Sequence, residues 1–343
     1  MNPSAGTSVP SPTPEITTPK ETLMTRPESA PRPSSNSAAS QLRSRDMPNP
    51  VHLIRRYPML SFAALACLFG WSPYIASALG HFEHPENTPL GPVLAALVVL
   101  LCQGRSSLGA WWKRIRSVRT APGWHALALL APALAHVVGV LVNHGLGAPL
   151  PTGEQLSHWP QVPITFVVML VLVGIGEEAA WTAFAAPVLL RRHGLLGAWA
   201  IMSALRIFWH LPLMIGGQMP WAVGIVANAG FQMIVLVMLS ASGGRWSLAA
   251  VWHASLNALG FSWFFGMVSG PDLERLSTIQ WVAYGVMGTA ALVLSRRLRS
   301  TGDAAETVIH EATPAPLVTD RTRYGSRGER PTIPSAATRR ATA

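Results

Sequence analysis

Eight stretches of mainly apolar residues alternate with short polar segments along the middle of the chain. Most are close to the ~20 residues that an α-helix needs to cross a bilayer. The second is short and the fourth is long, and we expect the fourth to bend near its glycines and at Pro187, because proline interrupts a helix. The pattern predicts an all-α, polytopic membrane helix bundle of about eight transmembrane helices, at residues 58–79, 90–102, 124–142, 162–190, 195–214, 221–240, 247–267 and 279–294.

The two ends of the chain have a different composition. Residues 1–50 and 301–343 contain many Pro, Ser, Thr and Arg residues and show no hydrophobic periodicity, so they cannot bury a core. We expect two disordered cytoplasmic tails around a transmembrane bundle at residues 51–300. No apolar core follows the first Met, so a cleaved secretory leader is not expected.

Composition agrees with a membrane protein. The chain is 49% hydrophobic and 12% charged, about half the ~25% of charged residues in soluble domains. The formal net charge of +10 does not indicate nucleic acid as a partner, because no basic run is interleaved with aromatic residues in a folded segment. Membrane lipid is the expected partner. Cys67 and Cys102 lie in apolar stretches and have neither metal-site nor disulfide spacing.

Basic residues occur in every second loop, which predicts the orientation. They precede the first apolar stretch and follow the second, fourth, sixth and eighth, and only Arg275 breaks the alternation. Lys and Arg mark the cytoplasmic side of a membrane protein, so both termini are expected to be cytoplasmic. Within one of these loops, residues 106–118 form either an amphipathic helix at the interface or a plain basic loop with two anchoring tryptophans.

Two adjacent carboxylates, Glu177 and Glu178, end the apolar run 162–175. One ionised carboxylate at the centre of a membrane helix costs roughly 2.5–3.5 kcal/mol, and two side by side also repel each other. Such a pair indicates a functional site that faces a polar cavity.

Two more pairs of polar residues lie in later apolar stretches. Arg206 and His210 are four residues apart, as are His253 and Asn257, so each pair shares one helix face. Because polar groups in lipid need one another, we expect both pairs to converge on the carboxylates. Packing within the bundle is the preferred interpretation of the remaining polar residues, His125, His136, Asn228 and Gln232.

This set of residues could hydrolyse an amide bond. A carboxylate beside a histidine can take a proton from water, and a second histidine with an asparagine can stabilise an oxyanion. Ser255 lies on a different helix face from His253 and Asn257, so water is the expected nucleophile. A zinc site made by Glu177, His210 and His253 stays open as an alternative.

The motifs resemble a known family. Glu177-Glu178 with Trp181, His210 in Phe-Trp-His-Leu-Pro, and His253-x-x-x-Asn257 are similar to the three motifs of the CAAX-protease and bacteriocin-processing (CPBP, or Abi) intramembrane proteases. That family includes the type II CAAX prenyl endopeptidases, and the resemblance covers about residues 160–270.

The resemblance implies an integral membrane endopeptidase, for which we expect a bacterial plasma membrane. It implies that Glu177 activates water with help from His210, that His253 and Asn257 stabilise the oxyanion, and that Glu178 supports the site. Members of the family have been described as metalloproteases and as metal-independent glutamate proteases, so the cofactor is zinc or none, and we favour none. The substrate would be a peptide or protein, which could be prenylated.

Two positions depart from the family pattern. Thr182 stands where the first motif usually has Arg, and Arg206 stands where the second usually has Phe. We interpret these changes as a swap, in which Arg206 reaches the carboxylates from the neighbouring helix. The alternatives are a non-catalytic scaffold whose site has decayed, and a proton-coupled transporter. The sequence contains no repeat of the kind that transporters often show.

Overall fold

The computed structural model describes residues 49–81, 85 and 87–299, all within one unit of the chain, Asn49–Ala343. Every regular element among these residues is a helix, which confirms the predicted all-α class. The predicted tails lie outside the described residues, apart from Asn49, which caps the first helix, and Pro50, which begins it.

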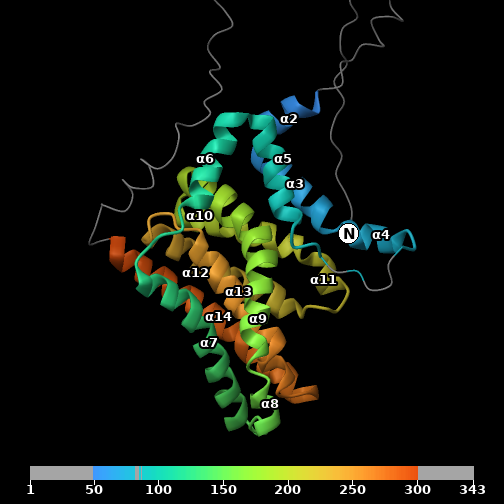
Figure 1. Cartoon of the computed structure of the whole chain (residues 1–343), viewed down its shortest axis with the longest axis vertical. Coiled ribbons are helices and arrows are strands. Elements are labelled where there is room, and N and C mark those ends of the chain that lie inside the picture. Colours follow the sequence, from blue (N-terminus) through green and yellow to red (C-terminus); the bar gives the residue numbers. More distant parts are fainter. Residues whose placement is uncertain (1–48, 82–84, 86, 300–343) are drawn as a thin grey trace, which may run out of the picture. The chain divides into compact units, whose positions relative to one another are not determined.

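Figure 1 shows how the helices are arranged. In chain order they are α2 (Pro50–Arg56), α3 (Pro58–Gly70), α4 (Ser72–Ala78), α5 (Gly91–Gln103), α6 (Arg105–Arg116), α7 (Pro122–Gly145), α8 (Gly153–Ser157), α9 (Gln161–Met169), η1 (Leu170–Glu178), η2 (Trp181–Ala185), α10 (Ala186–Trp209), α11 (Leu211–Ile215), η3 (Val223–Ala227), α12 (Asn228–Ala241), α13 (Ser247–Ser262), η4 (Phe264–Gly266) and α14 (Gly270–Arg299).

The chain reverses direction inside α10, at Gly194. This residue has φ 64° and ψ −174°, a conformation that glycine adopts without the steric cost that other residues meet. The reversal brings Arg206 into contact with Glu178. At 1.5 Å per residue, the 28 residues between them would span roughly 42 Å of straight helix. The apolar stretches 162–190 and 195–214 therefore form two separate arms.

Among the described residues, four helical segments are long and apolar enough to cross a membrane, and the number is five if the bent pair α2 and α3 counts as one span. The four are residues 122–145, 161–209, 223–241 and 270–297, and the second of them contains the reversal at Gly194. Helices α5, with 13 residues, and α13, with 16, are shorter than a typical span. The structure thus agrees with a helical membrane protein, and eight crossings stay a prediction.

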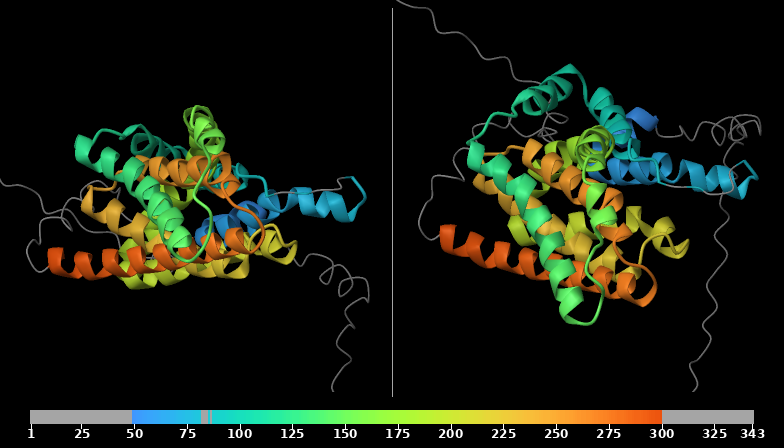
Figure 2. Two further views of the ribbon diagram at one scale, coloured as in Figure 1. Left: turned by 90° about the horizontal axis from the view of Figure 1, so that it is seen from below. Right: turned by 60° about the horizontal axis from the view of Figure 1, so that its bottom comes forward.

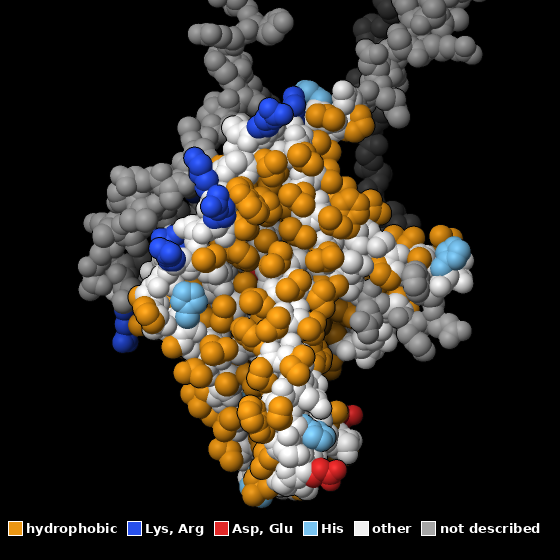
Figure 3. All heavy atoms as spheres, in the orientation of Figure 1, with side chains coloured by type: hydrophobic (Ala, Val, Ile, Leu, Met, Phe, Trp, Pro, Cys, Tyr) orange, Lys and Arg blue, Asp and Glu red, His pale blue; other side chains and the backbone are white. Residues whose placement is uncertain are grey.

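Large apolar side chains point outward from α7 and α9. Leu130, Leu134 and Leu141 on α7 are exposed, as are Ile164 and Val167 on α9, and Figure 3 shows hydrophobic side chains over most of this face. A soluble monomer rarely leaves such a large apolar surface in water. These helices therefore have the surface of a lipid-facing bundle.

Helix α13 lies between α7 and α9 in Figure 1 and packs against both, and it also contacts η1. The views in Figure 2 show the same neighbours. The hydrophobic core has one large cluster, built on Phe62, Trp181 and Trp209, and a second around Phe231 and Trp252. Helix α13 carries His253 and Asn257 and η1 carries Glu177 and Glu178, so this packing is what places the first and third motifs next to each other.

The fourth apolar stretch was expected to bend near its glycines and at Pro187, and the structure has a wider helix near the glycines. Residues of η1 and η2 form π-helix, with hydrogen bonds from residue i to i−5. Gly174 and Gly176 lie in η1, and a Cβ atom on Gly176 would lie 2.6 Å from the Pro89 carbonyl oxygen. Pro187 lies in the first turn of α10, where proline is tolerated. Short π-helical segments occur frequently at functional sites.

Helices α12 and α14 cross at Gly230, where a Cβ atom would lie 2.2 Å from the Tyr284 carbonyl oxygen. We expect Gly230→Ala to lower the free energy of unfolding by about 1–3 kcal/mol, because the backbone of α14 cannot move away cheaply. Thermal unfolding in detergent measures the change. Gly123→Ala in α7 is the control, because nothing lies within 4 Å of its Cβ position. Equal melting temperatures for the two variants would contradict the close crossing.

Candidate active site

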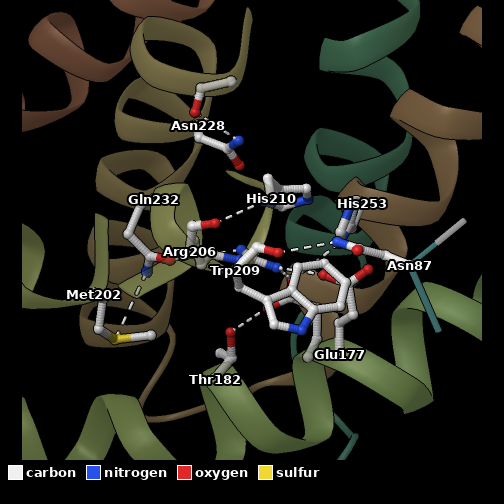
Figure 4. A network of polar contacts seen from close by, with 12 residues as sticks. Asn87, Glu177, Thr182, Met202, Arg206, Trp209, His210, Asn228, Gln232 and His253 are labelled. Carbon is white, nitrogen blue, oxygen red and sulfur yellow. Dashed lines mark hydrogen bonds and ion pairs between the residues drawn. The ribbon is translucent and has the colours of Figure 1, made fainter. Parts of the chain in front are cut away.

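Glu178 makes more polar contacts than the neighbouring Glu177. Its Oε1 atom pairs with an Arg206 amino group and lies 2.9 Å from Nδ1 of His253, and its Oε2 atom accepts a hydrogen bond from the Thr182 hydroxyl. The side chain is fully buried. Figure 4 shows Thr182, Arg206 and His253, which come from three different helical segments. Both oxygens of Glu178 are therefore held by the protein.

Glu177 is held on one side only. Its Oε2 atom lies 3.3 Å from Nη2 of Arg206, and within the described part of the chain its Oε1 atom accepts no hydrogen bond. The residue is 4% exposed. The two neighbouring carboxylates therefore differ, since Glu177 keeps an oxygen atom free for another partner and Glu178 does not.

Arg206 is the positive charge between the two carboxylates, and it is buried on α10. Its guanidinium carbon lies 4.9 Å from the ring centre of Phe231 and 5.8 Å from that of Trp181, within cation–π range. Nη1 also lies 3.5 Å from Oε1 of Gln232. Aromatic rings, an amide and two carboxylates thus fix the guanidinium in one position.

His210 and His253 are each oriented through Nδ1. For His210, Nδ1 lies 2.8 Å from the Arg206 carbonyl oxygen, and for His253 it lies near Glu178. A carbonyl or an ionised carboxylate only accepts hydrogen bonds, so each Nδ1 carries the proton and donates. Nε2 is then the free nitrogen of both rings. His210 is 9% exposed, and the His253 side chain is 12% exposed.

Asn257 lies one turn beyond His253 on α13 and is half-buried. Its amide makes no hydrogen bond to the described residues, so it is free to bind another group. Ser255 faces elsewhere, since its hydroxyl donates a hydrogen bond to the Leu129 carbonyl. The hydroxyl proton of Ser255 is therefore bound by a main-chain carbonyl and not by a base.

The polar groups fit a metal ion poorly. Ligand atoms of Glu177, Glu178 and His253 lie within 4.8 Å of one another, whereas His210, expected as the third zinc ligand, is not in this group. The guanidinium of Arg206 contacts both carboxylates and supplies the positive charge that a metal ion would bring. The donor set therefore favours a site that works without a metal ion.

Three residues have roles that the sequence did not predict. The Asn87 amide, before α5, donates a hydrogen bond to the Trp209 carbonyl at 3.0 Å, beside His210. Gln232, interpreted as a packing residue, contacts Arg206. Thr182 binds Glu178 with its hydroxyl. Asn87 lies in a loop between apolar stretches, where no pattern in the sequence distinguishes it, while Gln232 was visible as a polar residue in a span.

Two of the other polar residues of the spans, Asn228 and His136, have local contacts. Asn228 donates to the Gly224 carbonyl on its own helix. His136 is buried, with Nδ1 2.8 Å from the Pro132 carbonyl oxygen and its ring 5.0 Å from that of Phe264. His125 is half-buried and makes no hydrogen bond to the described residues. The contacts of Asn228 and His136 agree with the packing interpretation, which stays a prediction for His125.

The fold and the site together define a helical membrane protein with a buried Glu–Arg–His centre. Residues 159–259 match the family model described as type II CAAX prenyl endopeptidase Rce1-like. The match contains all three motifs and confirms the family resemblance over this segment, which points to a protease. A comparison with curated proteins found no match.

Replacing Arg206 tests its role in the buried charge network. We expect Arg206→Met to lower the free energy of unfolding by about 3–5 kcal/mol, because it leaves buried carboxylates without their counter-charge. Combining Arg206→Met with Glu178→Gln should regain part of this loss, since one unpaired charge is removed. Melting temperatures in detergent measure both effects. A single variant as stable as the unchanged protein would show that the ion pairs contribute little.

Proposed function

We propose that the protein is an intramembrane endopeptidase that hydrolyses a peptide bond with a water molecule activated by Glu177. The observation that carries this proposal is the difference between the two carboxylates. Both oxygens of Glu178 are bound by the protein, and Oε1 of Glu177 has no hydrogen bond to the described residues. Glu177 is therefore the carboxylate that can accept a proton from water, and Glu178 the one that holds other side chains in place.

His210 is suited to orient this water. Because its Nδ1–H donates to the Arg206 carbonyl, Nε2 has a lone pair that can accept a hydrogen bond from the water. The carbonyl also fixes the plane of the ring. A water molecule held by Glu177 and His210 loses one proton to the carboxylate as its oxygen attacks the scissile carbonyl carbon.

His253 and Asn257 are suited to stabilise the oxyanion that this attack forms. The Asn257 amide can donate a hydrogen bond directly. Donation from Nε2 of His253 requires the protonated ring, and the Glu178 carboxylate at Nδ1 provides the counter-charge for it. Glu177 can then return its proton to the leaving amine, so the peptide bond breaks and the carboxylate is regenerated.

Arg206 and Thr182 together occupy the role of the arginine that the family usually has in its first motif. The guanidinium comes from α10, contacts both carboxylates and neutralises the repulsion between them. The Thr182 hydroxyl binds the remaining oxygen of Glu178. This arrangement supports a working site in which the charge has moved to a different helix.

A non-catalytic protein is the second candidate, and one contact favours it. The ion pair between Arg206 and Glu177 competes with water for the carboxylate that would act as the base. Measured hydrolysis decides between the two functions, and a transporter is a further outcome of the same test if substrate crosses the membrane unchanged.

We expect the purified protein to cleave members of a tagged peptide library, and Glu177→Ala to reduce the rate by roughly 10²–10⁴-fold, the usual contribution of a general base. Glu154→Ala serves as the control, because Glu154 is an exposed acidic residue on α8. Mass spectrometry of the products measures cleavage. Equal rates for Glu177→Ala and the unchanged protein would contradict the mechanism.

A chelator tests whether a metal ion takes part. We expect cleavage to continue unchanged after metal removal, because Arg206 supplies the positive charge at the carboxylates. Metal analysis of the purified protein accompanies the assay. If activity is lost with the chelator and returns when zinc is added, the metal-independent version is wrong.

The proposed swap of the arginine is tested by moving it back. We expect Arg206→Phe to abolish cleavage, because both carboxylates lose their counter-charge, and Arg206→Phe with Thr182→Arg to recover part of the activity. Arg296→Phe, at an exposed position near the end of α14, controls for loss of an arginine elsewhere. A double variant as inactive as the single one would refute the swap.

A further inference from the structure

Helix α6 has one charged face and one face buried against the bundle. Arg105, Lys113 and Arg116 are exposed, together with Trp112, whereas Trp111 on the opposite face is buried. The helical alternative predicted for residues 106–118 is confirmed up to Arg116, where the helix ends. Figure 3 shows Lys and Arg side chains gathered along the edge where Figure 1 places α6, and acidic side chains at the far end near α8.

The buried face of α6 donates two hydrogen bonds to the helix that carries the carboxylates. The Trp111 indole N–H binds the Ala179 carbonyl at 3.0 Å, and Nη1 of Arg114 binds the Ala183 carbonyl at 2.6 Å. These two carbonyls directly follow Glu178 and Thr182, the two residues joined by the hydroxyl–carboxylate hydrogen bond. The position of α6 is therefore linked to the π-helical turn that holds Glu178.

The end of α6 also binds the start of the helix that carries His253. The Trp246 indole N–H, just before α13, donates to the Ile115 carbonyl at 3.0 Å. Arg245 donates to the Ser117 hydroxyl, and the Ser247 hydroxyl lies 3.4 Å from the Val118 carbonyl oxygen. Helix α6 and residues 117–118 thus connect the two segments that supply Glu178 and His253.

The basic residues of α6 have no acidic partner within the described part of the chain, where no ion pair involves Arg105, Lys113, Arg114 or Arg116. Burial lowers the pKa of the Arg114 guanidinium, and the nearby positive charge of Arg191 lowers it further. A negatively charged group at this surface would relieve that repulsion. Clusters of Lys and Arg on an amphipathic helix beside a membrane are typical of binding to anionic lipid.

We propose that the exposed face of α6 binds the headgroups of anionic phospholipids, and that this binding orders the π-helical turn at Glu178 through Trp111 and Arg114. The exposed Trp112 can insert beside the headgroups, as tryptophan does at membrane interfaces. Neither lipid binding nor the ordering of the turn rests on the proposed peptidase function.

Lipid binding is tested with the full chain in nanodiscs of phosphatidylcholine with and without phosphatidylglycerol. We expect native mass spectrometry to show selective retention of phosphatidylglycerol. Lys113→Gln with Arg116→Gln should weaken lipid retention roughly 30-fold, because each basic residue near an anionic surface contributes a similar favourable free energy and two of them are removed. Arg296→Gln with Arg297→Gln on α14 removes the same charge from another part of the expected cytoplasmic side, so it measures the general attraction of basic residues to anionic lipid and should weaken retention less. Equal retention by both double variants would overturn the site.

The link to the catalytic turn is tested by hydrogen–deuterium exchange of residues 174–185. We expect phosphatidylglycerol to slow exchange there in the unchanged protein. Trp111→Phe, which removes the indole N–H and keeps an aromatic ring, should retain the lipid and lose the slowing. Inorganic phosphate should not reproduce the effect. If exchange is still slowed in Trp111→Phe, the link through Trp111 is wrong. If phosphate alone slows exchange, the ligand is not a lipid headgroup.

Hydrolysis measured in the same nanodiscs separates this proposal from the proposed function. If the protein cleaves no peptide but shows the expected lipid retention and exchange pattern, the peptidase function fails and the lipid site stands. If it cleaves peptides equally well in neutral and anionic nanodiscs and retains no phosphatidylglycerol, the lipid site fails and the peptidase function stands.

Discussion

The site depends on one buried guanidinium between two adjacent carboxylates. Without Arg206, Glu177 and Glu178 would place like charges side by side in a low-dielectric interior, where repulsion and desolvation are both large. Phe231 and Trp181 flank the guanidinium, and the Arg206 carbonyl orients His210. A single residue therefore links the proposed base, its supporting carboxylate and the histidine that would orient the water.

Much of this arrangement follows from the sequence. Apolar stretches predicted a helical membrane protein, and residues that cannot remain alone in lipid, such as Glu178 and His253, were expected to converge. The departures from the family pattern predicted a contact between Arg206 and the carboxylates, and the structure contains it. These inferences succeed because a charge in hydrocarbon has few acceptable partners, so a short list of polar residues constrains the geometry.

Other features depend on backbone geometry that hydrophobicity does not encode. The π-helical turns of η1 and η2, the reversal at Gly194 and the contact of Asn87 with Trp209 all need three-dimensional packing. Pattern alone does not determine the number of membrane crossings, because short helices such as α5 are apolar without being long enough to span a bilayer. Trp111 was visible as an interfacial aromatic residue, but its partner, the Ala179 carbonyl, was not.

The reversal at Gly194 also bears on the order in which the chain enters the bilayer. Arg206 follows Glu178 by 28 residues, whereas His253 follows it by 75. During synthesis from the N-terminus, the guanidinium reaches the carboxylates as the second arm of a helical hairpin, well before the segment with His253 leaves the ribosome. Glu178 and Arg206 can then enter the lipid together as an ion pair, which lowers the penalty of inserting either arm by itself.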